Sequence, residues 1–168
     1  MEIWDLYDKN RNKLNKTIER GKSLTDDEYH LVVNAWIRND KNEFLISQRS
    51  ANKAHPLMWE TTGGSAIAGE ESIDAAIREV KEELDVTISK DTGKFLGTTL
   101  RYYPNCPDIL DVWLFTSNAK IDQVKYQKEE VCNAMWTSPE KIRKLCKEGK
   151  FEANAYLEEA LTYFEKNK

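Results

Sequence analysis

Apolar, β-rich runs that alternate with segments of helical periodicity constrain the fold most strongly. The run LVVNAWI at residues 31–37 is nearly all apolar, and ILDVWLFT at residues 109–116 is a second run of this type. Runs of this length between turn residues are typical of buried strands. Because such strands and helices follow one another without repeats or low-complexity tracts, the 168 residues predict a single compact α/β domain.

These patterns divide the chain into expected elements. Strands are expected at residues 2–7, 16–19, 31–37, 44–47, 98–103, 109–116 and 135–137, with 31–37 and 44–47 paired as a buried hairpin. Helices are expected from Ser72, as N-cap, to Leu84, from Ser138 and Pro139 to Gly149, and from about Ala153 onward. Residues 1–28 then form an N-terminal strand extension, and residues 138–168 form C-terminal helices that cover the sheet.

Composition disfavours several classes of function. A formal net charge of −4 gives nucleic acid or an acidic membrane no general basic surface to bind. The charged N-terminus, MEIWDLYDKN, lacks the apolar core of a signal peptide, and no run approaches a bilayer span. The three cysteines form no C-x-x-C pair, which indicates free thiols rather than a disulfide framework or zinc site. We therefore expect a cytoplasmic protein that binds neither nucleic acid nor membranes.

The segment from Glu70 to Asp85 is unusually acidic, with seven acidic residues against two basic ones. Ile73, Ile77, Val80 and Leu84 recur at helical spacing and form an apolar stripe that faces the core. Glu79, Glu82 and Glu83 cluster on a separate face, where like charges repel one another. Either this face is exposed to solvent, or a divalent cation such as Mg²⁺, which prefers carboxylate and water oxygens, neutralises it.

The spacing of the whole segment favours the cation. It resembles the Nudix box, G-x5-E-x7-R-E-U-x-E-E-x-G-U with U a bulky aliphatic residue, through Gly64, Glu70, Arg78, Glu79, Val80, Glu82, Glu83 and Val86. Eight of the nine specified positions match, and the departure is Asp85 in place of glycine. Because Asp tolerates a left-handed conformation at a helix end, this departure affects the turn and not the acidic side chains.

The resemblance implies a Nudix fold, in which a mixed β-sheet is sandwiched between α-helices. It also implies a hydrolase that uses Mg²⁺ or Mn²⁺ to cleave a diphosphate linkage in a phosphorylated small molecule, typically a nucleoside diphosphate joined to another group. The residues implied as metal ligands are Glu79, Glu83, Glu82 and a backbone carbonyl at Gly64. Arg78 is expected to orient a glutamate, and Glu70 to brace the loop. Dimers are common in such families, so a homodimer is an open expectation.

Signals outside the box are weaker, and each has a structural alternative. Glu130 precedes a late strand, where related enzymes place a metal ligand or general base, but it can equally be a loop charge in solvent. Arg49 ends the FLISQR strand and is a candidate for binding substrate phosphate, with an ordinary surface arginine as the alternative. Tyr102, or its neighbour Tyr103, could stack on a base, although such residues are often part of a core. The sequence suggests no role for Asp111.

Two other functions are open at this point. The segment EYHLVVNAWIRNDKNEFLISQRS, which includes His30, is similar to isopentenyl-diphosphate isomerase, a Nudix-fold enzyme. That enzyme carries its catalytic cysteine in a C-G-H-P stretch, whereas WETTGGSA here has neither the cysteine nor the histidine, so a proton donor is missing. His30 is then expected to be a core or hydrogen-bonded residue. A non-catalytic module that senses a nucleotide is the other possibility, against which the intact carboxylates argue.

Overall fold

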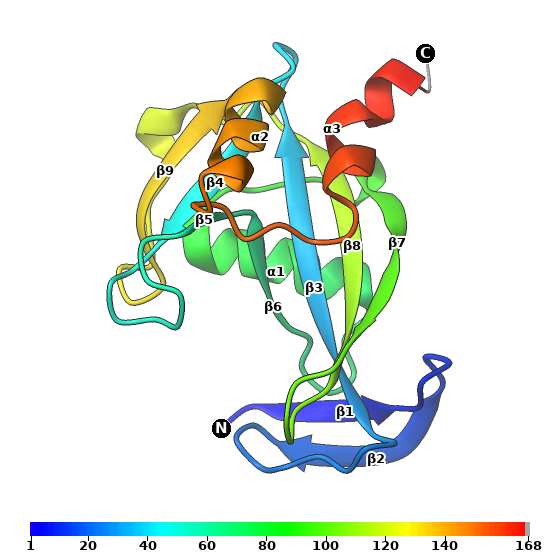
Figure 1. Ribbon diagram of the computed structural model, residues 1–168. Coiled ribbons are helices and arrows are strands. Elements are labelled where there is room, and N and C mark those ends of the chain that lie inside the picture. The colour runs from blue at the N-terminus through cyan, green and yellow to red at the C-terminus, as the bar shows by residue number, and fades with distance from the viewer. Residues whose placement is uncertain (167–168) are drawn as a thin grey trace.

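The computed structural model describes residues 1–166, and within this range nine strands form one mixed sheet. The strands are β1 (Ile3–Tyr7), β2 (Lys13–Glu19), β3 (Tyr29–Arg38), β4 (Phe44–Arg49), β5 (Trp59–Glu60), β6 (Thr62–Ser65), β7 (Lys94–Arg101), β8 (Asp108–Thr116) and β9 (Val131–Thr137). The helices are α1 (Ser72–Leu84), α2 (Pro139–Lys147) and α3 (Leu157–Lys166), with 3-10 turns at Lys90–Thr92 and Ile121–Gln123. Figure 1 shows their arrangement.

Strand β3 is the centre of the sheet. One edge of it pairs with β8 in parallel from His30 to Arg38. Its other edge pairs in turn with β1 at Tyr29 and His30, with β6 from Val32 to Ala35, and with β4 at Arg38. Because alternate side chains of a strand point to opposite faces, the nearly continuous apolar run of β3 indicates burial on both faces.

The predicted hairpin of 31–37 with 44–47 is confirmed only next to its turn, where the two strands pair antiparallel. The two strands share one pair, Arg38 with Phe44, because β6 occupies the rest of that edge of β3. Strand β4 instead pairs antiparallel with β9 along most of its length and with β5 on its other side. The short strands β5 and β6 were not expected, since WETTGGS has neither the length nor the alternation of a strand.

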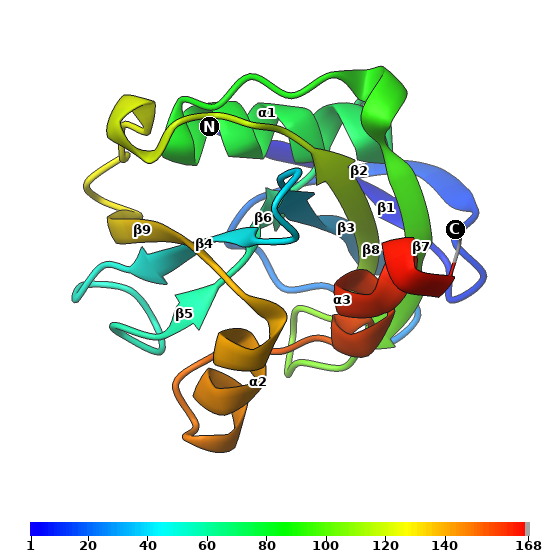
Figure 2. The ribbon, with the colours of Figure 1, turned by 90° about the horizontal axis from the view of Figure 1, so that it is seen from above.

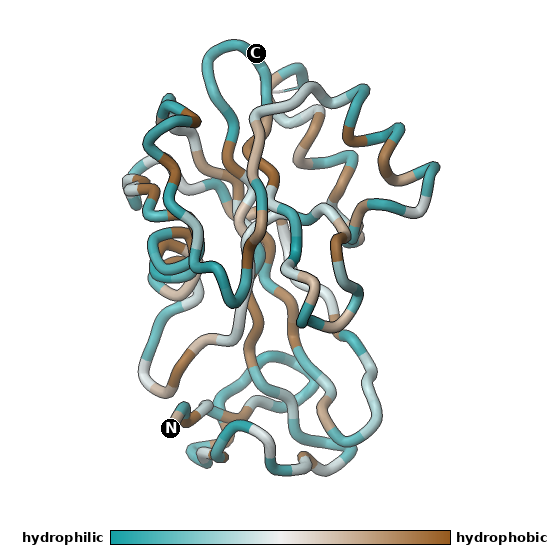
Figure 3. The backbone as a smooth tube through the Cα atoms, turned by 90° about the vertical axis from the view of Figure 1, so that its left-hand side faces the viewer, coloured by the Kyte–Doolittle hydropathy of each residue, from teal (hydrophilic) through white to brown (hydrophobic). Residues whose placement is uncertain are grey.

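Helices cover both faces of the sheet, as the Nudix resemblance implied. Helix α1 lies on one face, and α2 and α3 lie on the other (Figures 1 and 2). Val33, Ile37 and Val80 belong to the core under α1, whereas Trp36, Ile142 and Leu161 belong to the core under α2 and α3. Along the backbone, brown apolar stretches follow the central strands and teal polar stretches follow the outer turns (Figure 3).

The helix ends partly match their sequence signals. Ser72 is the first residue of α1 and not its cap; its hydroxyl accepts a hydrogen bond from the Trp113 indole at 2.8 Å. Asp85 ends α1 in the left-handed conformation, with φ of 54°, as expected of a residue in the glycine position. Helix α2 begins at the predicted Ser138 cap, and Gly149 follows its end with φ of 67°.

Several other boundaries differ from the expected ones. Strand β7 begins at Lys94, four residues before the predicted start at 98, and ends at Arg101, before the proline-containing loop. Helix α3 begins at Leu157 and not near Ala153, because residues 150–156 form an extended strap. The predicted end of this helix at residue 168 lies outside the described residues. No helix within residues 1–166 has the length and hydropathy needed to cross a bilayer.

The N-terminal strands β1 and β2 form a hairpin that gives Asp111 a role. Asp111, on β8, is completely buried on the α1 side of the sheet. Arg11, in the turn of the hairpin, reaches Asp111 as an ion pair, with its Nε donating to Oδ1 at 3.1 Å. Thr98 donates a further hydrogen bond to the same oxygen at 2.8 Å. The hairpin is therefore tied to the centre of the sheet through a buried charge.

Replacing Arg11 with alanine should destabilise the protein, because it leaves the Asp111 carboxylate buried without its counter-charge. Loss of one partner of a fully buried pair costs about 3–5 kcal/mol. Since the Arg11 side chain is 39% exposed, we expect a smaller loss, about 1–3 kcal/mol, in the free energy of unfolding measured by urea titration.

The double variant Arg11→Ala/Asp111→Asn serves as the control. It removes both charges and should recover part of the stability lost in Arg11→Ala. Arg20→Ala, which removes an exposed pair with Glu2 on the same hairpin, should have little effect. Equal losses in Arg11→Ala and Arg20→Ala would contradict the role assigned to the buried pair.

Candidate active site

The site is built where helix α1 crosses strand β6. Gly64 pairs with Val33 in the sheet, and the carboxylate of Glu79 lies directly against the Gly64 backbone. A Cβ atom at position 64 would overlap the Glu79 carboxylate, so this close approach requires glycine. The glycine of the strand and the glutamate of the helix, 15 residues apart in the sequence, therefore lie in contact.

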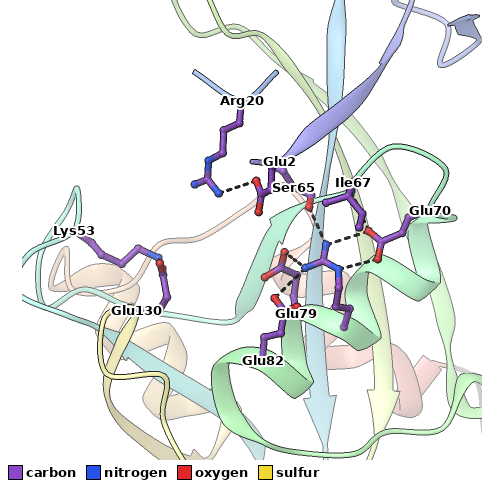
Figure 4. A network of polar contacts seen from close by, with 10 residues as sticks. Glu2, Arg20, Lys53, Ser65, Ile67, Glu70, Glu79, Glu82 and Glu130 are labelled. Carbon is purple, nitrogen blue, oxygen red and sulfur yellow. Dashed lines mark hydrogen bonds and ion pairs between the residues drawn. The ribbon is translucent and has the colours of Figure 1, made fainter. Parts of the chain in front are cut away.

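Arg78 organises the acidic side chains around this contact, and Figure 4 labels its partners Ser65, Glu70, Glu79 and Glu82. Its Nε and Nη2 donate to the two carboxylate oxygens of Glu70, at 2.7 and 3.0 Å. Its Nη1 donates to Glu79 at 2.8 Å and to Glu82 at 3.1 Å, and its Nη2 also donates to the Ser65 carbonyl at 3.0 Å. One guanidinium thus connects the helix, the loop before it and strand β6.

Glu83 lies in a different environment from the one expected of an acidic helix face. Its side chain is buried, at 5% exposed, and its Oε2 atom has no hydrogen-bond partner. Burial raises the pKa of Glu83 to about 8, and the nearby carboxylates of Glu60 and Glu79 act in the same direction. The alternative of a solvent-exposed charged face is therefore wrong for Glu83, although Glu82 is 52% exposed.

Glu130 comes from a distant part of the chain to the same region. It immediately precedes β9, and its carboxylate forms an ion pair with Lys53 in the loop after β4 (Figure 4). Its charge also contributes to the raised pKa of Glu83, which Lys53 opposes. Four carboxylates therefore act on one another electrostatically: Glu60 of β5, Glu79 and Glu83 of α1, and Glu130 before β9.

The oxygen atoms of this cluster fit a divalent cation. Within residues 1–166, no three acidic, cysteine or histidine side chains are already arranged around one metal position. However, Glu83 presents a buried carboxylate oxygen that lacks a partner, and an uncompensated charge of this type is costly in a protein interior. Burial also raises the pKa of Glu79, although Arg78 opposes the shift. Carboxylates and a backbone carbonyl are the donors that Mg²⁺ prefers.

A cavity of about 460 Å³ opens beside the carboxylates on the face of the sheet opposite α1. It crosses four adjacent strands, from Gly64 on β6 through Val32 on β3 and Leu110 on β8 to Thr99 on β7. Glu60 lines it at the carboxylate end, so the cluster and the cavity share a wall. The volume is typical of small-molecule sites.

The strap at residues 150–156 forms one side of this cavity. It leaves α2, pairs with β5 through two hydrogen bonds to Trp59, and then crosses the sheet toward β7 (Figures 1 and 2). Asn154 donates to the Asn34 side chain on β3 at 2.9 Å, and the Tyr156 hydroxyl donates to the Thr98 carbonyl on β7 at 2.9 Å. The strap is thus anchored across the width of the cavity.

Comparison with known proteins agrees with this geometry. The model of the NUDIX domain matches residues 28–159. The chain belongs to the Nudix hydrolase family. An uncharacterized Nudix hydrolase of Listeria innocua is 38% identical over 155 residues, which cover 90% of this chain and 88% of the relative. Because relatives of this similarity are Nudix hydrolases, the chain belongs among enzymes.

Solved structures match over most of the Nudix chain as well. A Deinococcus radiodurans protein matches 95% of this chain and 97% of its own, with a TM-score of 0.73 and 22% identity. A MutT protein of Methanosarcina mazei matches 89% of this chain and 98% of its own, with a TM-score of 0.63 and 28% identity. The mixed sheet between helices is therefore the Nudix fold, as the sequence predicted.

The structure brings most of the predicted site residues together. Gly64, Arg78, Glu79, Glu83 and Glu130 lie around one region, and Glu82 lies at its exposed margin. Arg49 lines the cavity, where its guanidinium donates to Glu60 at 2.7 Å. Tyr102 does not line the cavity. It lies on a separate depression, whereas the neighbouring Tyr103 lines both that depression and the cavity.

Sequence reasoning missed two charged residues of the site. Glu60 pairs with Arg49 and raises the pKa of Glu83, and its signal was its place three residues before Gly63 in WETTGG. Lys53 pairs with Glu130, 77 residues away, and no local pattern indicated that contact. Both residues lie in segments without regular periodicity. In such segments, the charge of a residue does not indicate whether it belongs to the site.

The metal-free protein should lose stability as pH rises. The pKa of Glu83 is about 8 in the folded protein and has an ordinary value of 4.5 when exposed. Between these values the folded state binds more protons than the unfolded state. The stability that the protonated Glu83 contributes below about pH 4.5 is therefore lost by about pH 8. Chemical denaturation of wild type and Glu83→Gln in excess chelator, from pH 5 to 8.5, measures this difference.

Glu83→Gln keeps the size of the side chain and cannot ionise, so its curve should be flatter across that range. Asp74→Asn, an exposed change on the same helix, should retain the wild-type slope. Identical slopes for wild type and Glu83→Gln would show that Glu83 does not titrate with a raised pKa.

Proposed function

We propose that this protein is a metal-dependent pyrophosphatase that cleaves a diphosphate linkage in a phosphorylated small molecule. The observation that carries the proposal is the buried Glu83 carboxylate oxygen without a partner, next to Glu79 and Gly64 in the Nudix box. A phosphate-rich substrate would be repelled by bare carboxylates, so a cation must lie between them. Mg²⁺ or Mn²⁺ would neutralise phosphate oxygens and lower the pKa of the attacking water.

Glu79 and Glu83 are the first candidates to hold the cation, with Glu82 and the Gly64 carbonyl as further ligands. Glu79 and Glu83 lie one turn apart on α1, so their carboxylates project from the same side of the helix. Arg78 acts as a positioning residue, because it fixes Glu79 and Glu82 and is itself held by both oxygens of Glu70. Its five donors make such a fork possible, which lysine could not replace.

Glu130 is the candidate general base or additional ligand. It lies within electrostatic range of Glu83 but belongs to a separate segment, so it can face the opposite side of a bound phosphate. Lys53 holds its carboxylate in the structure described here. A base of this type takes a proton from water as the bond to phosphorus forms.

The cavity supports a substrate with a group attached beyond the diphosphate, of the nucleoside-diphosphate-X type. Arg49, at the wall shared with the carboxylates, is placed to contact phosphate, and the space beyond it is both polar and apolar. A cytoplasmic location and a homodimer stay predictions of the sequence. A purely nucleotide-sensing role is less consistent with these residues, because binding alone gains nothing from a buried carboxylate without a partner.

Glu83→Gln should reduce turnover by orders of magnitude, because charge in the transition state loses a metal-bound counterion. Release of phosphate or nucleotide from a panel of diphosphate compounds with Mg²⁺ or Mn²⁺ measures the effect. Asp74→Asn is the control for a lost charge on α1 and should retain activity. Near-normal turnover in Glu83→Gln, or full wild-type activity in excess chelator, would refute the proposed mechanism.

Isopentenyl diphosphate should not be isomerised. None of the three cysteines lines the cavity, and His30 is buried, stacked on Trp4 at 4.2 Å and within 3.3 Å of the Pro107 carbonyl. Neither a thiol nor this histidine can therefore reach a double bond held in the cavity. Incubation with isopentenyl diphosphate and Mg²⁺, followed by analysis for dimethylallyl diphosphate, measures the reaction, and detection of that product would disprove the expectation.

A further inference from the structure

We propose that the Ser47 hydroxyl positions the Glu83 carboxylate for a bound cation by donating a hydrogen bond to it. This inference rests on the proposed function and adds to the site a residue outside the Nudix box. Ser47, on β4, is 1% exposed, and its hydroxyl oxygen has no hydrogen-bond partner. Because a buried hydroxyl without a partner is costly in a protein interior, it indicates a role beyond the stability of the fold.

The Ser47 side chain lies on the face of the sheet that α1 covers. Alternate residues of a strand point to opposite faces. Leu45 belongs to the core under α1, whereas Phe44 and Ile46 belong to the core under α2 and α3. Ala134, the partner of Ser47 on β9, also belongs to the core under α1. The Ser47 hydroxyl therefore points toward the helix that carries the candidate metal ligands.

Glu83 points from α1 toward the same part of the sheet. It lies seven residues, about two helical turns, after Ala76, which is completely buried in the core under α1. The loop after α1 joins this end of the helix to β4. The backbone N–H of Gln127 donates to the Glu83 carbonyl at 3.0 Å, and the N–H of Val131 donates to the Gln127 carbonyl at 2.8 Å. Since Val131 pairs with Arg49, Glu83 faces the C-terminal end of β4.

Glu60 connects the two positions. It pairs with Ser47 in the ladder of β4 with β5, so the two side chains lie on the same face with Cβ atoms about 5 Å apart. The Glu60 carboxylate is also near enough to Glu83 to raise its pKa. The nearby cations are already engaged, because Arg49 pairs with Glu60 and Lys53 pairs with the carboxylate before β9. A neutral hydroxyl therefore lies among carboxylates, where it can serve as a donor.

The hydroxyl and the carboxylate are matched for a hydrogen bond once Glu83 holds a cation. In the structure described here, neither the Ser47 hydroxyl nor Glu83 Oε2 has a partner, so the two are not bonded to each other. A carboxylate that holds a cation is ionised, and ionised carboxylates accept the stronger hydrogen bonds. The rotatable O–H of Ser47 can turn toward it. Hydrogen bonds of this kind fix the orientation of metal-ligating carboxylates.

The test is the affinity for Mn²⁺ without substrate, measured by electron paramagnetic resonance or calorimetry. Ser47→Ala should bind Mn²⁺ about 10- to 100-fold more weakly than wild type. Its midpoint of urea unfolding in excess chelator should be unchanged or higher, because the metal-free protein loses no hydrogen bond. The double variant Ser47→Ala/Glu83→Gln should bind Mn²⁺ no more weakly than Glu83→Gln, because Ser47 acts through Glu83.

Ser72→Ala is the matched control. Ser72 is also buried, in the first turn of α1, but its hydroxyl has a partner in the Trp113 indole at 2.8 Å. Ser72→Ala should unfold at a lower urea concentration in excess chelator and should bind Mn²⁺ as wild type does. The two buried serines should therefore respond in opposite ways.

The inference is overturned if Ser47→Ala binds Mn²⁺ as wild type does while Glu83→Gln binds it more weakly; the proposed metal site would then stand without Ser47. It is also overturned if Ser47→Ala loses stability in chelator and Ser72→Ala loses as much affinity for Mn²⁺, which would give Ser47 a structural role. If wild type binds no Mn²⁺, or if Glu83→Gln binds it as wild type does, the proposed function fails as well. The two failures therefore give different results.

Discussion

The contact between the Arg78 guanidinium and its four partner residues is the interaction on which the rest of the site depends. Arg78 connects the Glu70 carboxylate before α1, two glutamates on α1 and the Ser65 carbonyl of β6. These partners hold the helix close enough to β6 for the Glu79 carboxylate to touch the Gly64 backbone. Because hydrogen bonds to ionised groups are the strong ones, this fork can hold several like charges together.

Arg78 does not compensate for all of the acidic charge. Its donors serve Glu70, Glu79 and Glu82, and none of them reaches the buried Glu83. In the metal-free protein, Glu83 is consequently held in a neutral form up to about pH 8. The fold thus satisfies the carboxylates that determine the shape of the site and leaves one without a partner, where the proposed cation would bind. The uncompensated Glu83 therefore lowers the stability of the metal-free fold, and a cation bound there would restore it.

The features that the sequence predicted correctly are those that depend on the pattern of neighbouring residues. Helical spacing placed Glu79, Glu82 and Glu83 together, and the box placed Gly64 opposite them; Asp85 also adopted the left-handed turn expected of it. What depends on long-range contacts was not predictable. The β4 ladder with β9, the ion pair of Lys53 with Glu130 and the extended strap each join residues that no local period relates. Tyr102 and Tyr103 are both plausible from sequence, and of the two only Tyr103 lines the cavity of the folded chain.

This division explains why the family membership leaves the substrate open. The carboxylate end of the site comes mainly from residues 60–83, a segment whose geometry a single helix and a short strand impose. The cavity draws its walls from β3, β7, β8, the loop after β4 and the strap, segments that are together spread over more than 100 residues of the sequence. A change in the strap or in the turn after β7 can therefore alter the shape of the cavity without moving Arg78 or its partners. In this architecture the chemistry is set locally, and the choice of substrate is set by distant segments that only the folded chain brings together.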